Sequence, residues 1–358
     1  MELQNYINNN DDYLKCLRKN NISVSKNKEY NVYILKCYRN KEYDYEKNPW
    51  MKYCRGAIVD AVTNKVLCVP PVKSNEIEDL NKIIKDYDST NKYEPLIDGT
   101  MINMFYKDNK WILCTRSSVG AKNSWDGKVP FYKLFTGIQG TEWYSELKKE
   151  YCYSFVFQHI QNRIVTPVTN NAIYLIESYD MSGDVPITAE LPLINGITNI
   201  IRLTGDDLKE YLKEPIFFSI KGLTVKDKSG KRINWINPLY KKVLGLKMNH
   251  NNKFLNYMES FEKDILNEYL YYYPEDTELY TQYYNQIIQL KDKLYQMYCN
   301  IYILKHSSLK DAPYALKPVL YDIHGEYLKT KEKINRVKID HYVNNLPHKK
   351  LLFIINRL

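Results

Sequence analysis

The chain has 358 residues, and at roughly 150 residues per domain this length predicts two domains, with enough chain for a sizeable core. The hydrophobic fraction of 44%, the charged fraction of 26% and the mean hydropathy of -0.52 are ordinary for a globular protein, and no uncharged apolar run approaches the roughly 18 residues of a membrane span. The net charge of +9 favours polyanionic partners. The first residues are polar and acidic, unlike a secretory signal, so we expect a soluble, cytoplasmic protein without a membrane partner.

Up to about residue 250, short β-branched and aromatic runs alternate with turn signals, which is typical of strands. Thr63-Asn64 and Asp108-Asn109 separate such runs at hairpin spacing and favour antiparallel sheets. A few helices are expected within this part, notably at 77–87 and 206–212. The strands are expected at 31–37, 56–59, 65–69, 101–106, 111–114 and 153–157.

Beyond residue 250 the apolar residues recur every three or four positions, which predicts helices. One long amphipathic helix is expected over about 279–304, with Asp276 or Thr277 as its cap and Pro274 ending the preceding helical segment, 254–272. The predicted domains are therefore 1–250, of mixed α+β type, and 251–358, helical. A heptad reading of the long helix would permit a dimer, so the oligomeric state stays open.

Seven cysteines are scattered without CxxC spacing, which indicates neither a disulfide framework nor a zinc site and favours a reducing compartment. Tyrosine is unusually abundant, with 34 residues, but Asn, Lys and Ile are abundant too. This composition is typical of AT-rich genomes, such as those of many large DNA viruses. It therefore favours a viral origin, with the infected host cytoplasm or the virion as the location.

The excess positive charge is concentrated in the first 250 residues, because residues 251–358 carry 15 basic and 13 acidic side chains. Within 221–247, eight basic residues stand against Asp227 alone. Such a block attracts phosphates or nucleic acid, although a solvated basic face without a ligand would have the same composition.

P-loop, HExxH and GxSxG motifs are absent from the sequence. An ordered series of short motifs is present instead: Cys54-Arg-Gly-Ala-Ile-Val-Asp60, Val66 to Lys73, Leu96-Ile-Asp-Gly-Thr100, Thr115-Arg-Ser-Ser-Val-Gly120, Phe155-Val-Phe-Gln158 with Asn162-Arg163, Lys221-Gly-Leu-Thr-Val-Lys226 and Ile233-Asn-Trp-Ile236 leading to Tyr240. In order and spacing this series resembles the covalent nucleotidyltransferase superfamily of ATP-dependent ligases and capping enzymes, and most closely the phage and viral RNA ligases. The resemblance implies two antiparallel sheets around a nucleotide-type cleft, followed by an α-helical C-terminal domain.

In that family the lysine of Lys-x-Asp-Gly attacks the α-phosphate of ATP. Aligned on Asp98-Gly99, this position is Leu96, which has no nucleophilic atom. Other catalytic positions have changed as well: the acidic residue of the third motif matches Gln158, the glutamate of the fourth matches Lys221, and the two lysines of the fifth match Asn234 and Ile236. The resemblance thus implies a pseudoenzyme with no catalytic residue, no metal site and no cofactor.

Several residues keep the types that the family uses near the nucleotide or line the basic block. Glycines can persist for tight turns, and arginines can persist as structural hubs, so this retention has a structural as well as a binding interpretation. The residues expected in the vestigial cleft, with possible RNA or nucleotide contacts, are Arg55, Leu96, Asp98, Gly99, Arg116, Gln158, Lys221, Lys226, Lys241 and Lys242; Gly120, Arg163 and Gly222 are also retained.

Three functions follow as alternatives. The first is a catalytically inactive RNA-ligase-like protein that binds RNA or a protein partner through the vestigial cleft and its basic rim. The second is a structural or assembly component that uses the ligase fold as a scaffold. The third is an active RNA ligase or nucleotidyltransferase with a substitute nucleophile, for which Lys92 is the nearest candidate, although a strand places it roughly 13 Å from Leu96. Charge balance at the first motif further predicts an ion pair between Asp98 and Lys221.

Overall fold

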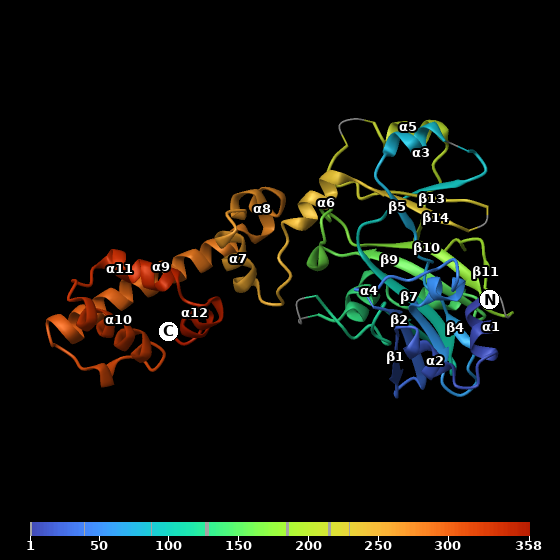
Figure 1. Ribbon diagram of the computed structural model, residues 1–358. Helices are drawn as coiled ribbons and strands as arrows, with labels where there is room; N and C mark the ends of the chain where they lie inside the picture. The colour runs from blue at the N-terminus through green and yellow to red at the C-terminus, as the bar shows by residue number, and fades with distance from the viewer. Residues whose placement is uncertain are drawn as a thin grey trace. The chain divides into compact units, whose positions relative to one another are not determined.

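The computed structural model describes residues 2–38, 40–86, 88–125, 129–183, 186–213, 216–228 and 230–358 (Figure 1). The chain divides into two compact units, Met1–Leu244 and Gly245–Leu358. The first unit holds all the strands of the described residues, and the second holds helices only. No helix among the described residues is long and apolar enough to cross a membrane.

An antiparallel sheet of order β1-β2-β3-β4 begins the first unit. Helices α1 and α2 lead into it, and their apolar residues Leu3 and Leu17 are fully buried in its core with Ile22 and Leu35. The predicted Thr63-Asn64 hairpin joins β3 to β4, with Asn64 in the left-handed region at φ 57°. The bounds are α1 Glu2–Asn8, α2 Tyr13–Lys19, β1 Ile22–Asn27, β2 Val32–Cys37, a 3-10 helix at Pro49–Tyr53, β3 Arg55–Asp60 and β4 Val66–Cys68.

The second sheet has the order β11-β10-β9-β7-β8, with β12 paired to β10. Phe105 and Cys152 on one face share the core of the first sheet, whereas Phe155 and Phe157 on the other face pack with Phe135 of α4. This sheet therefore lies between the first sheet and α4. The bounds are β7 Thr100–Lys107, β8 Lys110–Cys114, α4 Phe131–Gln139, a 3-10 helix at Glu142–Glu146, β9 Tyr151–Gln158, a 3-10 helix at Ile160–Asn162, β10 Ala172–Asp180, β11 Ile187–Thr188 and β12 Thr198–Asn199.

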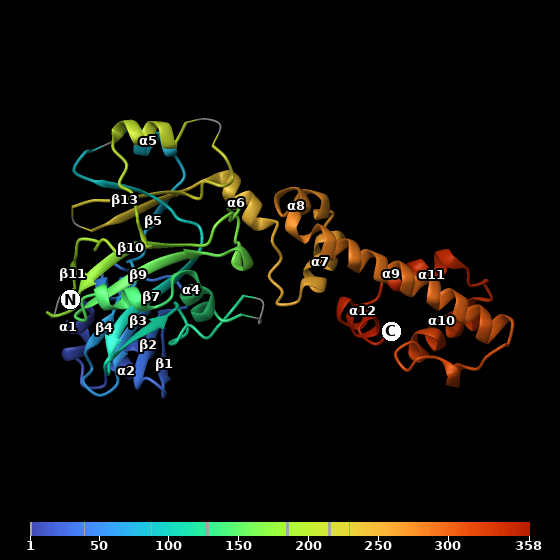
Figure 2. The same ribbon diagram turned by 180° about the vertical axis from the view of Figure 1, so that it is seen from behind.

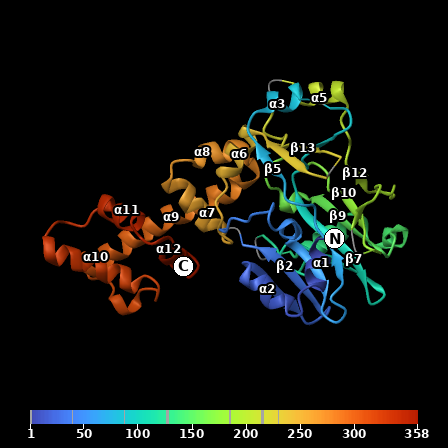
Figure 3. The same cartoon turned by 45° about the vertical axis from the view of Figure 1, so that its right-hand side comes forward.

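The third sheet has the order β5-β14-β13-β6, and α3 and α5 cover its outer face (Figure 3). Leu223 and Trp235 of the sheet pack there with Leu208 of α5. Thr204 caps α5 through the amide of Asp207. The bounds are β5 Asn75–Ile77, α3 Leu80–Lys85, β6 Lys92–Pro95, α5 Gly205–Tyr211, β13 Gly222–Lys226, β14 Arg232–Ile236 and α6 Pro238–Gly245.

The second unit contains helices α7 to α12, and its long helix α9 continues into one π-helical turn at Cys299–Ile303. Asp276 stands at the N-cap position of α9 but does not cap it, because its carboxylate binds Lys253 and Tyr269 instead. The bounds are α7 Lys253–Glu262, α8 Leu266–Tyr272, a 3-10 helix at Pro274–Asp276, α9 Thr277–Tyr298, a 3-10 helix at Leu309–Asp311, α10 Lys317–Thr330, α11 Arg336–Asn344 and α12 His348–Ile355.

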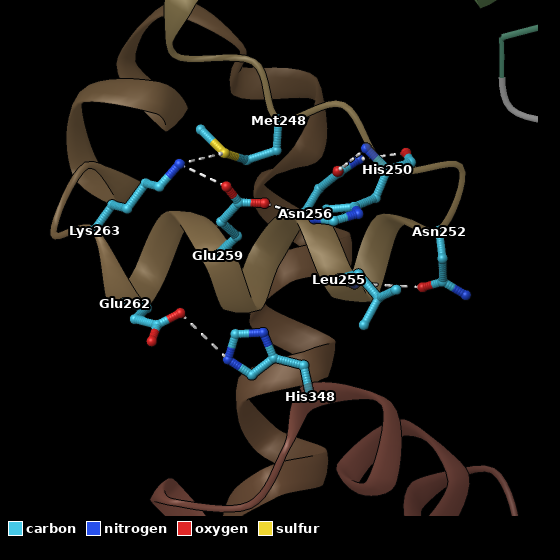
Figure 4. A network of polar contacts seen from close by, with 9 residues as sticks. All are labelled: Met248, His250, Asn252, Leu255, Asn256, Glu259, Glu262, Lys263 and His348. Carbon is cyan, nitrogen blue, oxygen red and sulfur yellow. Dashed lines mark hydrogen bonds and ion pairs between the residues drawn. The ribbon is translucent and has the colours of Figure 1, made fainter.

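The segment that precedes α7 is fastened to that helix by polar contacts (Figure 4). His250 exchanges backbone hydrogen bonds with the Asn256 side chain, and its imidazole Nε2 lies 2.5 Å from Glu259 Oε2. On the other side of α7, His348 of α12 pairs with Glu262 at 3.6 Å. These contacts define the packing of both chain segments on α7.

The α+β class, the antiparallel sheets and the helical C-terminal region are confirmed. The first unit contains one sheet more than the two expected. The helix expected at 77–87 is wrong in its bounds, because residue 77 ends strand β5 and the helix covers only Leu80–Lys85; Tyr87 lies outside the described residues. The segment 254–272 is two helices, divided where Asp264 adopts φ 54°.

Candidate functional site

The chain crosses from the third sheet to the second between β6 and β7, and Asp98 stands in this crossover. One carboxylate oxygen, Oδ2, accepts hydrogen bonds from the backbone amides of Val165 and Thr166, both at 2.9 Å. The other, Oδ1, accepts one from the Tyr240 hydroxyl at 2.6 Å. With its side chain only 3% exposed, Asp98 joins the loop after β9 to helix α6.

Lys221, just before β13, approaches the same crossover. Its ammonium donates to the Ile97 carbonyl oxygen at 3.2 Å and lies 3.9 Å from Asp98 Oδ1. The predicted Asp98–Lys221 ion pair is therefore present, at the long end of salt-bridge geometry and beside stronger hydrogen bonds to the same carboxylate. Burial lowers the pKa of Lys221 from its ordinary value, and the Asp98 charge offsets part of that shift.

Leu96 is the residue expected from the sequence at the position of the nucleophile. Its backbone amide donates to the Gly222 carbonyl oxygen at 2.9 Å, which extends the pairing of β6 with β13 by one residue. The side chain is half-buried and carries no atom that could attack a phosphate.

Gln158, at the end of β9, supports the crossover from the other side. Its amide Nε2 donates to the Asp98 carbonyl oxygen at 2.8 Å, and its Oε1 accepts a weaker hydrogen bond from the Tyr174 hydroxyl at 3.4 Å. Gly99 passes so close to β9 that a Cβ atom there would lie 2.4 Å from the Phe157 carbonyl oxygen. Gln158 and Gly99 thus have clear structural roles in this arrangement.

The residues at the crossover do not fit a divalent metal ion. Mg²⁺ prefers carboxylate and carbonyl oxygens, but Asp98 Oδ2 is already bound by two amides and Oδ1 faces an ammonium. Gln158 presents an amide here, and its Nε2 donates to the Asp98 carbonyl oxygen. Among the described residues, no group of three or more His, Cys, Asp or Glu side chains is arranged to hold a metal ion.

Arg55 and Arg116 lie near each other. Gly56 approaches Arg116 so closely that a Cβ would lie 2.9 Å from the Arg116 Cα, so the two chain segments are in contact. Arg116 donates a long hydrogen bond of 3.4 Å to the Cys37 carbonyl oxygen. Both guanidinium groups are half-buried, and burial together with the neighbouring Arg116 charge lowers the pKa of Arg55.

Lys226, one of the lysines expected as possible contacts, lies in a network of ion pairs. It is not an exposed rim residue, because its ammonium lies 2.6 Å from Glu94 and 3.5 Å from Glu177, with its side chain 12% exposed. Glu177 also pairs with Arg232 at 2.5 Å. This buried network was not expected from the sequence, where the only local signal is that Glu94 stands two residues before Leu96.

Lys241 and Lys242 lie on α6, both exposed. Lys241 pairs with Glu76 at 3.1 Å, and this surface pair is open to solvent on both sides. Exposed pairs of this kind contribute at most about 1 kcal/mol, so Lys241 can exchange its partner for a phosphate at low cost.

No protein-family model matches the chain, and no curated protein matches it in sequence. Among solved structures it is similar to an archaeal ATP-dependent RNA ligase in two forms: one at 11% identity, over 78% of this chain and 76% of that chain with a TM-score of 0.48, and the other at 9% identity, over 76% and 74% with a TM-score of 0.46. It is also similar to a Naegleria gruberi RNA ligase at 12% identity, over 48% of this chain and 57% of that one, with a TM-score of 0.35. These proteins are of the class that the ordered motifs resemble.

Proposed function

We propose that this chain is a catalytically inactive RNA-ligase-like protein that binds RNA or a protein partner through its vestigial cleft and basic rim. The proposed catalytic inactivity is supported by the residues at the crossover between β6 and β7. Leu96 has no nucleophile, and Asp98 is held by two backbone amides and the Tyr240 hydroxyl. We infer that Asp98-Gly99 is retained for a structural role, as a joint: the hydrogen-bonded connection between the third and second sheets.

One observation supports the alternative of an active nucleotidyltransferase. Lys221 brings an amine of lowered pKa to the first-motif crossover, whereas Lys92 stands at the far end of β6. A lowered pKa increases the unprotonated fraction that attacks a phosphate. Against this alternative, the Lys221 ammonium is held by the Ile97 carbonyl oxygen and lies beside Asp98, which stabilises the protonated form.

Covalent labelling with a nucleotide distinguishes the inactive protein from the active nucleotidyltransferase. The full-length protein is incubated with α-labelled ATP or GTP and Mg²⁺ or Mn²⁺ and then denatured. We expect no protein-linked nucleotide, for the wild type and for Leu96→Lys alike, because the metal-binding carboxylates are absent as well. A phosphoramide adduct in the wild type that disappears in Lys221→Arg would overturn inactivity and identify Lys221 as the nucleophile.

Binding to single-stranded RNA tests the other half of the proposal. Affinity should fall with salt, and Lys241→Gln with Lys242→Gln should reduce the slope of log K against log salt by roughly 1 to 2. The matched control is Lys15→Gln with Lys19→Gln, which removes two exposed lysines from α2. RNA affinity that is absent, or equally affected by both pairs, would favour the assembly component.

A further inference from the structure

A pocket of about 600 Å³ opens in the first unit at the end of β13 remote from the Asp98 crossover. It lies between the β13–β14 hairpin, the segment after β4 and the strands β10 and β11, and Figure 2 shows β13 above β10 and β11. Gly222 begins β13 near the crossover and Lys226 ends it at the pocket, four residues or roughly 13 Å away. The pocket is thus a location separate from the first-motif position.

The charges that line this pocket are unbalanced. Seven lining side chains are cationic and two, Glu177 and Asp227, are carboxylates. The two deepest cations, Lys226 and Arg232, are compensated by Glu177 and by Glu94, which lies behind them. The positive excess therefore belongs to the outer lysines.

Those outer lysines are Lys52, Lys73, Lys92, Lys228 and Lys231, and they come from four separate chain segments. Lys52 pairs with Glu2 at 2.8 Å. Among the described residues, no carboxylate lies within 4.0 Å of the ammonium groups of Lys73, Lys92, Lys228 or Lys231. Four lysines whose ammonium groups have no carboxylate within 4.0 Å therefore line one concave space, and Lys228 interacts with the Asp88 carboxylate only at longer range.

The wall of the pocket adds to this positive character. The Lys73 ammonium lies 5.1 Å from the ring centroid of Tyr45, a contact that leaves its hydrogen-bond donors free for another acceptor. Behind this wall Arg55 is half-buried, and its pKa is lowered by burial and by the guanidinium groups of Arg116 and Arg232. Like charges held together in this way raise the local potential and attract an anion.

We propose that this pocket binds a small ligand with two or more clustered phosphate groups. Lysine ammonium groups bind phosphates as point charges, and convergence from several segments around a concave space favours a compact anion over an extended strand. Tyr45, Tyr53 and Tyr179 also line the pocket and can contact whatever carries the phosphates. The clustered phosphates could come from a free polyphosphate, a nucleotide or the end of an RNA strand.

Calorimetric titration of the full-length protein at physiological salt tests this proposal, with inorganic tripolyphosphate as the probe and orthophosphate and sulfate as comparisons. Tripolyphosphate should bind at least ten-fold more tightly than either. Lys73→Gln with Lys231→Gln should weaken it ten-fold or more, and Lys15→Gln with Lys19→Gln should change it less than two-fold. Equal weakening by both pairs, or no preference over orthophosphate, would show a diffuse charge effect and overturn the proposal. Tryptophan fluorescence melts verify that the variants are folded.

Calorimetric titrations with further ligands identify the molecule that carries the phosphates. Binding of ATP more tightly than tripolyphosphate would assign the pocket to a nucleotide. Preference for a 5′-triphosphate RNA over the same RNA with a 5′-hydroxyl, lost in the Lys73/Lys231 variant, would assign it to an RNA end. If the protein binds RNA but does not bind tripolyphosphate, the proposed phosphate pocket is refuted and the proposed RNA binding is supported. If the protein binds tripolyphosphate but does not bind RNA, the phosphate pocket is supported and the proposed RNA binding is refuted.

Discussion

Replacing Asp98 by alanine tests whether this carboxylate is the joint between the two sheets. The change removes the acceptor of the amides of Val165 and Thr166 and of the Tyr240 hydroxyl, and leaves the Lys221 ammonium without its anion. Each hydrogen bond to a charged group contributes about 1.5 to 3 kcal/mol, and breaking a buried pair from one side costs about 3 to 5 kcal/mol. Because these contributions share one carboxylate and are not additive, we expect Asp98→Ala to lower the free energy of unfolding of the first unit by about 3 to 5 kcal/mol.

The two hydrogen bonds to backbone amides also predict the behaviour of Asp98→Asn. An asparagine Oδ1 can accept from both amides, but its Nδ2 then faces the Lys221 ammonium. The expected loss is therefore smaller than for alanine, about 1 to 3 kcal/mol.

Urea denaturation followed by tryptophan fluorescence measures this loss in the first unit specifically. All five tryptophans of the chain belong to that unit: Trp50, Trp111, Trp125, Trp143 and Trp235. Asp11→Ala is the matched control, because Asp11 is an exposed aspartate of the same unit. A change of less than about 0.5 kcal/mol for Asp98→Ala, at an unchanged m value, would refute the role of Asp98 as a joint.

Three further outcomes follow from the same structure. Gly222→Ala should destabilise the first unit by several kcal/mol, because its Cβ would lie 2.1 Å from the Trp235 carbonyl oxygen, whereas Gly137→Ala in α4 meets no atom within 4 Å and should be neutral or stabilising by up to about 1 kcal/mol; equal urea midpoints for the two variants would contradict this. Glu177→Gln should cost about 3 to 5 kcal/mol, because the largely buried Arg232 loses its carboxylate partner and Lys226 keeps only Glu94; an unchanged midpoint in the same urea titration would contradict this. Burial lowers the pKa of Lys221 in the folded state, so between that pKa and the ordinary lysine value near 10.4 the unfolded chain binds more protons and stability should rise with pH. The stability of the wild type relative to Lys221→Met should therefore increase as the pH is raised toward about 10, and a constant difference would be evidence against the shift.

The sequence by itself predicted the features that depend on neighbours along the chain. Hairpins at Thr63-Asn64 and Asp108-Asn109 were predictable because asparagine and aspartate tolerate the left-handed conformation, and Asn64, Asp108 and Asn109 all adopt positive φ. The α+β class and the helical C-terminal region followed from the change of period near residue 250. That Leu96 has no nucleophilic atom was also visible in the sequence, because it depends only on which atoms a leucine has.

Only the tertiary structure decided how the charged residues are used. Lys226 and Lys73 look alike in a basic sequence, yet Lys226 is bound by two carboxylates and Lys73 faces a pocket with no carboxylate near its ammonium. Asp98 meets amides 67 and 68 residues away and a hydroxyl 142 residues away. The reason is physical: backbone conformation and hydrophobic periodicity are set by interactions over a few residues, whereas an ion pair or hydrogen bond requires angstrom-scale approach of groups whose separation along the chain carries no information about their separation in space.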